Sequence, residues 1–325
     1  MQASTDCRLP TKKSDESQFE CGKRENTFKI MRNVNPRVSV IVPTMAAPQR
    51  IHLLKRAVDS IRRSSQSFIR IIVVVNGNRF DHEACAWLRA QPDIQFEYVE
   101  EPSAPKAILK GRGLVTSEFF STLDDDDEYL EGATDDKLHL MDLAPNIDLV
   151  VANGFEVKNG VDTLFYSDFK QVSDNPLQCL MNFNWLHNCN ALYRTASFDI
   201  GYFADSHPYA EWTWLAFKCA MANKRIEVLQ KPAFRYHDTI ESLSKSAEYR
   251  NAAIPLFRRM LECGPPTDIA HAIQKKMGAA WHDASDVALK NGRRNEAFKC
   301  HLKSLLSPGG SRYLSFSRHF FMIHP

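Results

Sequence analysis

Four consecutive aspartates, Asp124 to Asp127, are the part of the sequence best suited to chemistry. Two carboxylates about 4 Å apart repel each other by roughly 4 kcal/mol at an effective dielectric constant near 20, so water or a cation must offset the repulsion. In an extended segment, Asp124 and Asp126 would point to one side and Asp125 and Asp127 to the other. Hard oxygen ligands on one side suit Mg²⁺ or Mn²⁺, which would bridge to substrate phosphates.

Two other interpretations of the acidic run come from the residues themselves. A solvated acidic loop is the simpler alternative, although the apolar strand expected before the run favours a site. A calcium-binding EF-hand loop needs glycine at its sixth position and glutamate at its twelfth, where this chain has Tyr129 and Asp135. The EF-hand is therefore rejected.

Other motifs of nucleotide and hydrolytic chemistry are absent from the sequence. The stretch Gly111 to Thr116 reads GxGxxT, lacks the third glycine of a dinucleotide fingerprint, and falls inside or after a predicted helix. No GxxxxGKS, GxxxxGKT, HExxH or GxSxG sequence occurs. The eight cysteines form no CxxC pair, which predicts reduced, buried thiols and no structural zinc.

Strands and helices that alternate along the chain must position the acidic run. The predicted strands are 38–42, 71–75, 96–99 and 119–123, and the predicted helices are 51–61 and 104–115. This order is typical of an α/β domain with a mostly parallel sheet covered on both faces. Ligands of such sheets bind at the carboxyl ends of the strands, so Pro43–Thr44, Asn76–Gly77 and the acidic run are expected in one crevice.

The pattern loosens after Ile147. Further strands are expected over 148–152, 189–193 and 226–229, with a buried helix over 212–222 and helices from about 251 onward. We therefore divide the chain into a polar N-terminal extension (1–36), an α/β domain (37–250) and a C-terminal helical region (251–325).

The first half of the α/β domain resembles the nucleotide-binding half of family 2 glycosyltransferases, which have the GT-A fold. The segments that carry the resemblance are Val40 to Thr44, Arg50, Leu53 to Ile61, Ile71 to Gly77, Lys110 to Gly113 and Phe120 to Leu130. The resemblance covers about two thirds of the chain and weakens after residue 147. It implies a GT-A type, mostly parallel twisted sheet flanked by helices, with a nucleotide-binding half (37–131), an acceptor half (132–250) and a C-terminal helical appendage.

The resemblance implies a donor site at the strand ends. Pro43 and Thr44 would line the nucleotide site, with Arg50 near the base or the diphosphate. Asn76 stands where the family often has an acidic residue that contacts the base. Lys110 stands where many members have arginine, and it would approach the diphosphate as a point charge.

The acidic run is similar to the family's DXD motif, formed here by Asp124, Asp125 and Asp126. By this resemblance Asp124 would face the ribose or the sugar, Asp125 would belong to the same donor site, and Asp126 would hold Mn²⁺ or Mg²⁺. His237 would reach the metal or the diphosphate, and the loop after it (242–245) would close over the donor.

A second acidic motif is expected to supply a general base. The segment 201–215 resembles the family's acidic motif before a buried helix, but the usual Glu-Asp pair is Ala210-Glu211 here. Glu211 is the candidate that would take the proton of the acceptor hydroxyl, and the helix N-terminus would favour its charged form. The alternative is that Glu211 only caps the helix, and Asp205 is the reserve candidate.

Two further sets of polar residues have structural alternatives. Lys110 and Arg112 would lie on a solvated helix face if they do not meet the diphosphate. The segment Trp185 to Asn190 could line an acceptor pocket, because aromatic and amide groups suit sugar faces and hydroxyls, but core packing explains Trp185 equally well.

These features predict a metal-dependent, inverting glycosyltransferase. It would move a sugar from a UDP-, GDP- or dTDP-sugar to a hydroxyl of a glycan or lipid-linked acceptor. Two rival functions are a nucleotidyltransferase and a non-catalytic carbohydrate- or protein-binding module. The first usually has a glycine-rich loop where this chain has Pro43 to Pro48, and the second is kept open by Asn76 and Ala210.

Charge and hydropathy limit the partners. Lys plus Arg total 41 against 39 Asp plus Glu, a net charge of +2, which argues against a nucleic-acid partner. No apolar run approaches the roughly 18 residues of a membrane-spanning helix, and residues 1–20 show no export signal, so a cytoplasmic location is expected. The aromatic and basic tail 311–325 could contact a membrane surface, or it could be an ordinary docked helix.

Overall fold

The computed structural model describes residues 35–238 and 252–321. Most of the predicted N-terminal extension and the predicted closing loop (242–245) lie outside these residues. The strands are β1 (Val38–Thr44), β2 (Ile69–Asn76), β3 (Ile94–Val99), β4 (Phe119–Thr122), β5 (Glu128–Tyr129), β6 (Leu149–Ala152), β7 (Phe155–Lys158), β8 (Val161–Leu164), β9 (Ala191–Arg194), β10 (Ile226–Leu229) and β11 (Phe234–His237).

Helices fill most of the chain between these strands and all of its C-terminal part. The α-helices are α2 (Ile51–Arg63), α3 (His82–Ala90), α4 (Ala104–Leu114), α5 (Ala133–Leu143), α6 (Pro176–Asn182), α7 (Gly201–Ala204), α8 (Glu211–Met221), α10 (Ala253–Glu262), α11 (Thr267–Lys290), α12 (Arg294–Leu305) and α13 (Arg318–Phe321). The 3₁₀ segments are η1 (Pro48–Arg50), η2 (Lys170–Val172), η3 (Thr195–Ser197) and η5 (Gly310–Ser317). Every strand and helix predicted from the pattern is present, within a few residues at each end.

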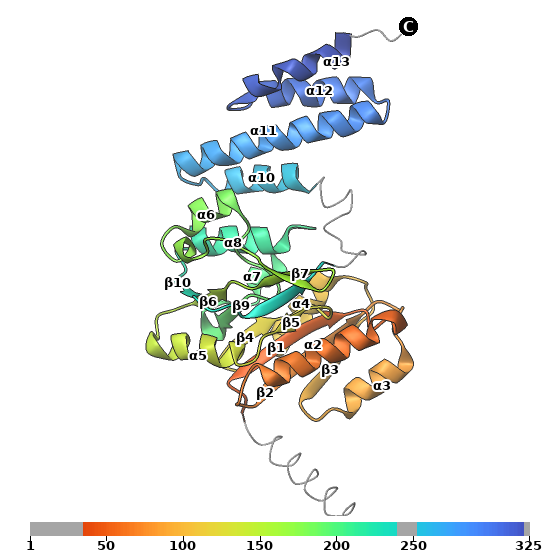
Figure 1. The fold of residues 1–325 in the computed structure, drawn as a ribbon, viewed down its shortest axis with the longest axis vertical. Helices are drawn as coiled ribbons and strands as arrows, with labels where there is room; N and C mark the ends of the chain where they lie inside the picture. Colours follow the sequence, from red (N-terminus) through yellow and green to blue (C-terminus); the bar gives the residue numbers. More distant parts are fainter. Residues whose placement is uncertain (1–34, 239–251, 322–325) are drawn as a thin grey trace, which may run out of the picture.

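A seven-stranded sheet forms the centre of the molecule, in the order β10-β6-β9-β4-β1-β2-β3 (Figure 1). Its strand pairs are parallel except for those of β9, which runs antiparallel to β4 and to β6. The predicted mostly parallel α/β sheet is therefore confirmed. The strands of residues 132–250 (β10, β6 and β9) form one side of the sheet and those of residues 37–131 (β4, β1, β2 and β3) the other, and the two halves are joined where β9 pairs with β4.

A smaller four-stranded sheet, β5-β11-β7-β8, lies beside the carboxyl end of the acidic run. β5 begins directly after Asp127 and pairs antiparallel with β11, so Tyr129 faces Phe234 across the two strands. This pairing brings a strand from residues 128–129 against one from residues 234–237. The position of the run thus depends on two segments about a hundred residues apart in sequence.

Both faces of the large sheet are buried, as its apolar strands predict. Along β1, Ile41 belongs to an apolar cluster that includes residues of α4, α6 and α8, whereas Val40 and Val42 belong to a second cluster that includes residues of α2 and α3. Alternate side chains of a strand point to opposite faces of the sheet. An unbroken run of β-branched residues therefore packs into the apolar core on each face. The carboxyl ends of the strands remain the open edge at which a ligand can approach.

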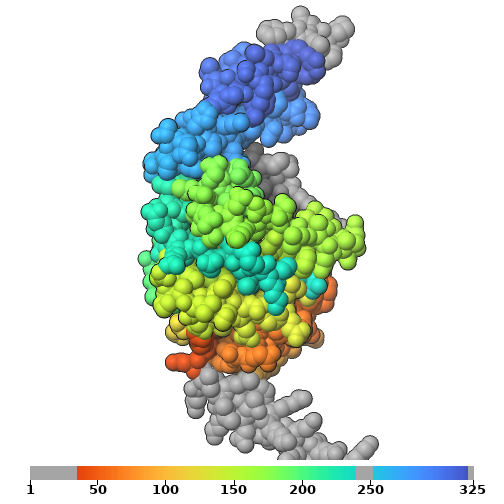
Figure 2. Space-filling view, turned by 60° about the vertical axis from the view of Figure 1, so that its left-hand side comes forward, coloured from red at the N-terminus to blue at the C-terminus, as the bar shows by residue number. Residues whose placement is uncertain are grey.

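The C-terminal helices form a separate stack on this body (Figure 1) and protrude from it in the space-filling view (Figure 2). Leu256 and Met260 of α10 and Ile269 and Ile273 of α11 belong to the same apolar cluster as α6 and α8. The predicted helical appendage is confirmed, and its first two helices share the core of the α/β domain. Within the described ranges, no helix is long and apolar enough to cross a membrane.

A matched pair of glycine substitutions on α4 tests this packing. A Cβ added to Gly111 would overlap Ile41 of β1, whereas one added to Gly113 would lie 3.5 Å from Ile200, an ordinary contact. Gly111→Ala should lower the free energy of unfolding by about 1–3 kcal/mol through overpacking. Gly113→Ala should be neutral or raise it by up to about 1 kcal/mol, because alanine favours helix. Chemical denaturation of both variants measures the difference, and equal stabilities would contradict the close approach of α4 to β1.

Candidate active site

The ends of three neighbouring strands meet at the acidic run, as the sequence predicts. Thr44, the last residue of β1, donates its hydroxyl to Asp125 Oδ2 at 2.5 Å. Asn76, the last residue of β2, donates its amide Nδ2 to the Thr44 carbonyl at 3.0 Å. Pro43 pairs in register with Val74 within the sheet. Hydrogen bonds therefore join the strand ends that the sequence predicts to lie together.

The acidic run turns, contrary to the extended conformation assumed from the sequence. Asp125 and Asp126 form a turn in which the Asp127 amide donates to the Asp124 carbonyl at 3.2 Å. The turn is needed because the chain must leave β4 and enter β5, which belongs to the other sheet. Burial nevertheless alternates: Asp125 and Asp127 are 5% and 1% exposed, and the other two carboxylates are partly exposed.

Each carboxylate of the run has its own partner. The Arg50 guanidinium is shared between Asp125, which it contacts closely, and Asp126, whose Oδ2 lies 2.9 Å from Nη2. Asn188 donates its side-chain amide to Asp124. Asp127 accepts from the backbone amide of His237 at 2.9 Å. One arginine is thus the direct cationic partner of two of the four carboxylates.

Burial makes the charge of this run unfavourable. Burial, followed by the charges of Asp126 and Asp125, raises the pKa of Asp124 to about 7. Burial also raises the pKa of Asp127 well above its usual value, and raises that of Asp125 in spite of Arg50. Carboxylates with raised pKa values that lie at the end of a sheet are typical of a site that binds a cation or exchanges a proton.

The donor set around Asp124 fits a hard divalent cation. Asn188 Oδ1 is buried and has no hydrogen-bond partner, although the same amide holds Asp124 through its nitrogen. An unpartnered amide oxygen beside a carboxylate is a pair of oxygen ligands that Mg²⁺ or Mn²⁺ accepts. Across the described residues, no group of three or more His, Cys, Asp and Glu side chains could hold a metal by itself. By this test the residues present would supply only part of a coordination shell, and substrate phosphates would have to supply the rest.

His237 lies beside the run, and its ring faces the carboxylate of Glu128. Its Nε2 lies 2.8 Å from Glu128 Oε1, and only its backbone amide contacts the run, at Asp127. The ring of His237 is thus held by Glu128. A role for His237 at the metal or the diphosphate stays a prediction.

Two contributors to the site were missed or misplaced by the sequence reasoning. Arg56 of α2 donates to the Asp126 carbonyl at 2.5 Å and lies 3.3 Å from Glu128, so it fixes the backbone of the turn. Asn188 was assigned to the acceptor pocket and instead holds Asp124. Arg56 lies six residues after Arg50, among other basic residues of α2. From the sequence alone, such a residue cannot be told from one on a solvated helix face, because the position of the acidic turn is not yet known.

The two basic residues of α4 have different environments. Lys110 is exposed and lies 3.6 Å from Glu97 of β3, away from the contacts of the acidic run. The solvated-face prediction is wrong for Arg112, which is 8% exposed and donates to the carbonyls of Phe198 and Thr195. Its guanidinium lies 4.6 Å from the Phe120 ring centre, so Arg112 joins α4 to the core.

Glu211 is the first residue of α8, as predicted, and is partly buried. Its Oε1 accepts the backbone amide of Tyr209 at 3.0 Å, which is a local capping contact. Tyr209 itself has φ +63°, a left-handed conformation that is costly for an aromatic residue. Burial raises the pKa of Glu211, against the opposing effect of the backbone hydrogen bonds. The roles of Glu211 as general base and as helix cap both stay predictions.

Asp205, the reserve candidate, is tied to structural partners. It forms ion pairs with Arg259 of α10 and with Lys218 of α8, and it accepts the Trp214 indole N–H at 3.2 Å. Partial burial would raise its pKa, but the Arg259 and Lys218 contacts outweigh this effect and lower the pKa. A strongly ionised carboxylate held by two cations is a weak proton acceptor. The geometry therefore favours Glu211 over Asp205.

The proposed acceptor lining at Trp185 to Asn190 is mostly core. Trp185 is fully buried and donates to the Pro176 carbonyl at 2.9 Å. Asn190 is also fully buried and accepts the backbone amide of His187 at 2.9 Å. Burial lowers the pKa of His187 to about 4, so its ring is neutral at physiological pH. Within this segment, Asn188 contacts Asp124 and the Cys189 side chain hydrogen-bonds to Asp127.

Comparison with known proteins agrees with this geometry. Residues 39–200, about half of the chain, match the profile of glycosyl transferase family 2. An uncharacterized glycosyltransferase of Rickettsia typhi is 27% identical over 242 residues, which cover 70% of this chain and 71% of that protein. A second, from Rickettsia prowazekii, is 26% identical over 192 residues, or 55% of this chain and 58% of that protein.

Solved structures share the fold. TarS of S. aureus (residues 1–349, in complex with UDP-GlcNAc) superposes with a TM-score of 0.56 at 18% identity, covering 79% of this chain and 74% of that one. The mannosyltransferase PcManGT of Pyrobaculum calidifontis, in complex with GDP-Man and Mn²⁺, gives 0.51 at 15% identity, covering 95% and 91%. The chain therefore belongs to glycosyl transferase family 2, and it is a glycosyltransferase with the GT-A fold.

Proposed function

We propose that this enzyme transfers a sugar from a nucleoside-diphosphate sugar to a hydroxyl of a glycan or lipid-linked acceptor, with a divalent metal and with inversion at the anomeric carbon. One observation carries the proposal. An acidic run with two buried and two partly exposed carboxylates lies at the carboxyl ends of β1, β2 and β4, and an unpartnered Asn188 oxygen lies beside Asp124. The two structural neighbours support the donor class, because one is in complex with UDP-GlcNAc and the other with GDP-Man and Mn²⁺.

The residues at the strand ends would bind and orient the donor. Asp124 and Asn188 Oδ1, with Asp126, would hold the metal, which when bound would supply Lewis-acid stabilisation of the leaving diphosphate. Arg50 pairs with Asp125 and Asp126. Its guanidinium would also form charge-assisted hydrogen bonds with a diphosphate bound at the turn. Thr44 and Asn76 hold the β1 end in place beneath the nucleotide. The predicted contact of Lys110 with the diphosphate would require the side chain to leave Glu97.

Glu211 would act as the general base. Its partial burial makes the carboxylate more basic, and the Tyr209 amide fixes one oxygen so that the other can accept a proton. The acceptor hydroxyl would give its proton to Glu211 as its oxygen bonds to the anomeric carbon and the bond to the diphosphate breaks. A single base opposite the leaving group gives one displacement and therefore inversion.

The two rival functions lose their basis. A nucleotidyltransferase and a non-catalytic module both conflict with membership of a glycosyltransferase family. Peripheral membrane contact through residues 311–325 stays a prediction, and residues 322–325 lie outside the described ranges.

A thermal-shift panel of UDP-, GDP- and dTDP-sugars with Mn²⁺ or Mg²⁺ tests donor and metal together. A ligand at about 100 times its Kd adds roughly 2.7 kcal/mol to the free energy of unfolding, so the matching donor should raise the Tm by several degrees. Asp126→Asn should remove the metal-dependent part of this rise. The exposed carboxylate variant Asp59→Asn is the control and should keep it. A donor shift of equal size with a chelator present would contradict the metal role.

Glu211→Gln tests the base. With the donor identified by the panel, kcat for transfer should fall by about 10²–10⁴-fold, because the amide cannot take the proton, while the donor-induced Tm rise remains. Glu83→Gln, a glutamate in the first turn of α3, is the matched control and should retain full activity. A wild-type kcat in Glu211→Gln would show that another residue is the general base.

Asp205→Asn separates a structural carboxylate from a catalytic one. Because the pKa of Asp205 is lowered on folding, its stabilising effect is present above the unfolded value near 4 and is lost as pH falls through the folded value. The variant should therefore melt a few degrees below wild type at pH 7, by at most about 1 kcal/mol for a half-exposed pair, and the gap should close toward pH 3. Its kcat should stay within severalfold of wild type, and abolished transfer at full stability would reinstate Asp205 as the base.

A further inference from the structure

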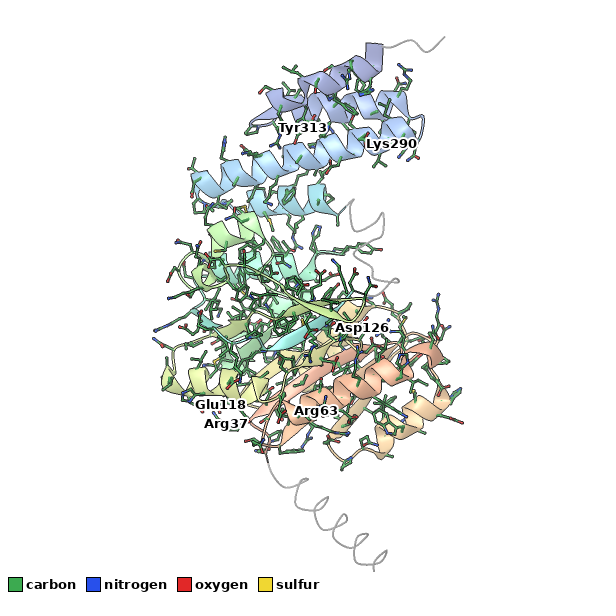
Figure 3. All side chains as sticks on the ribbon, viewed as in Figure 1. Arg37, Arg63, Glu118, Asp126, Lys290 and Tyr313 are labelled. Atoms are coloured by element: carbon green, nitrogen blue, oxygen red, sulfur yellow. The ribbon has the colours of Figure 1, made fainter. Side chains whose placement is uncertain are left out.

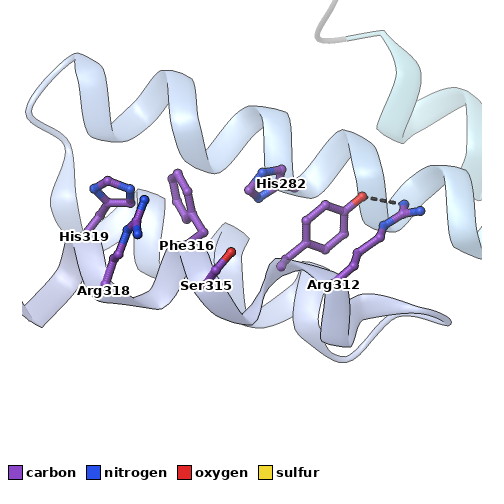
Figure 4. Close-up of a pocket in the computed structure, with 7 residues that line it drawn as sticks. His282, Arg312, Ser315, Phe316, Arg318 and His319 are labelled. Atoms are coloured by element: carbon purple, nitrogen blue, oxygen red, sulfur yellow. Dashed lines mark hydrogen bonds between the residues drawn. The ribbon is translucent and has the colours of Figure 1, made fainter.

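A small cavity lies in the C-terminal helical stack, where η5 and α13 pack against α11 (Figure 4). Its volume is about 140 Å³. The residues that line it are His282, Arg312, Tyr313, Ser315, Phe316, Arg318 and His319. Two arginines, two histidines and the hydroxyl-bearing residues Tyr313 and Ser315 therefore line one hollow, with Arg312 and Arg318 at its two ends (Figure 4).

The positive charge of this cavity has no acidic counterpart in the described residues. Neither arginine forms an ion pair within residues 35–238 and 252–321, and Arg312 donates only to the neighbouring Tyr313 hydroxyl, at 2.5 Å. No acidic side chain lines the cavity. From residue 297 to the end of the sequence there is no Asp or Glu at all.

The walls of the cavity are held by ring packing, which leaves one polar atom unsatisfied. His282 stacks on Tyr313 with ring centres 4.2 Å apart, and Phe316 meets the same imidazole edge-on at 4.8 Å. The Nδ1 atom of His282 is buried and has no hydrogen-bond partner. A buried ring nitrogen without a partner is costly, and His282 is one of the residues that line the hollow.

We propose that this cavity is a binding site for a phosphate group. Arginine forks match the oxygens of phosphate in two-point contacts, and the imidazole and hydroxyl groups add further donors. The volume excludes a whole nucleotide sugar, since pockets for such ligands span roughly 300–1,000 Å³. It admits a phosphate, since one water molecule occupies about 30 Å³. The ligand is therefore a free phosphate or the phosphate of a lipid headgroup at a membrane surface.

This site is independent of the proposed transfer reaction. Figure 3 shows Tyr313 in the outer helical stack and Asp126 in the body of the α/β domain. No residue of the cavity takes part in the contacts of the acidic run. The test below measures binding without donor or metal, so its failure would leave the proposed function intact.

The experiment uses the full chain and two probes. Inorganic phosphate is titrated by calorimetry, and vesicles of phosphatidylcholine with or without phosphatidic acid are sedimented with the protein. The double variant Arg312→Gln/Arg318→Gln should weaken binding of the effective probe by about tenfold or more, because both guanidinium contacts are lost. The matched control Lys290→Gln/Lys299→Gln removes the same charge from the same helical stack outside the cavity, and it should bind like wild type.

The two probes distinguish the sources of the phosphate. Saturable binding of inorganic phosphate that depends on the arginine pair supports a site for soluble phosphate. Arginine-dependent sedimentation with phosphatidic acid, but not with phosphatidylcholine alone, supports a lipid headgroup. Absence of binding to both probes, or equal weakening in the arginine and lysine variants, would overturn the proposal.

A second variant covers the case in which the double substitution disturbs folding. Ser315 is exposed at the rim, so Ser315→Asp keeps both arginines and places a carboxylate in the cavity. It should abolish phosphate binding with an unchanged Tm, because the new carboxylate pairs with the guanidinium groups. Unchanged phosphate affinity in this variant would equally overturn the site.

Discussion

Four carboxylates crowded at the end of one buried strand are the constraint on which the rest of this structure depends. Like charges at such spacing repel by several kcal/mol wherever the local dielectric is low. The fold offsets that repulsion with Arg50 from the segment before α2, the Thr44 hydroxyl from β1, and an amide from Asn188. Because these partners come from distant segments, the sheet must be complete before the run can exist as a site.

The C-terminal helices are not a loosely attached appendage, because α10 contacts the α/β domain directly. Arg259 of α10 joins Asp205 and the Ser206 carbonyl, and its guanidinium lies 4.1 Å from the Trp214 ring centre. These contacts hold the two ends of the segment that leads into α8, at whose start Glu211 lies. The rigid entry to α8 is thus built jointly by the α/β domain and by α10, which explains why α10 shares their apolar core.

Much of this could be predicted because local patterns are strong where strands are buried on both faces. The runs that became β1 and β2, the helix α8 and the gathering of Thr44, Asn76 and the acidic run all followed from periodicity and strand-end placement. The errors have one physical source, the identity of a side chain's partner. Arg112 looks solvated until the Phe198 and Thr195 carbonyls are placed. For Trp185, sugar lining and core packing are equal alternatives until Pro176 is found to accept its indole N–H.

The sequence by itself determined the α/β class, the positions of the strands and the presence of a dense acidic run at a strand end. It did so because the spacing of hydrophobic residues and the β-branched runs favour a helix or a strand through interactions between residues close in sequence. Only the tertiary structure decided that the run turns, that Arg50 serves two of its carboxylates while Asn188 serves a third, and that Asp205 is held by Arg259. Those outcomes depend on contacts between residues far apart in the chain, and charge and hydrogen bonding in a buried site are set by such partners rather than by neighbours in sequence.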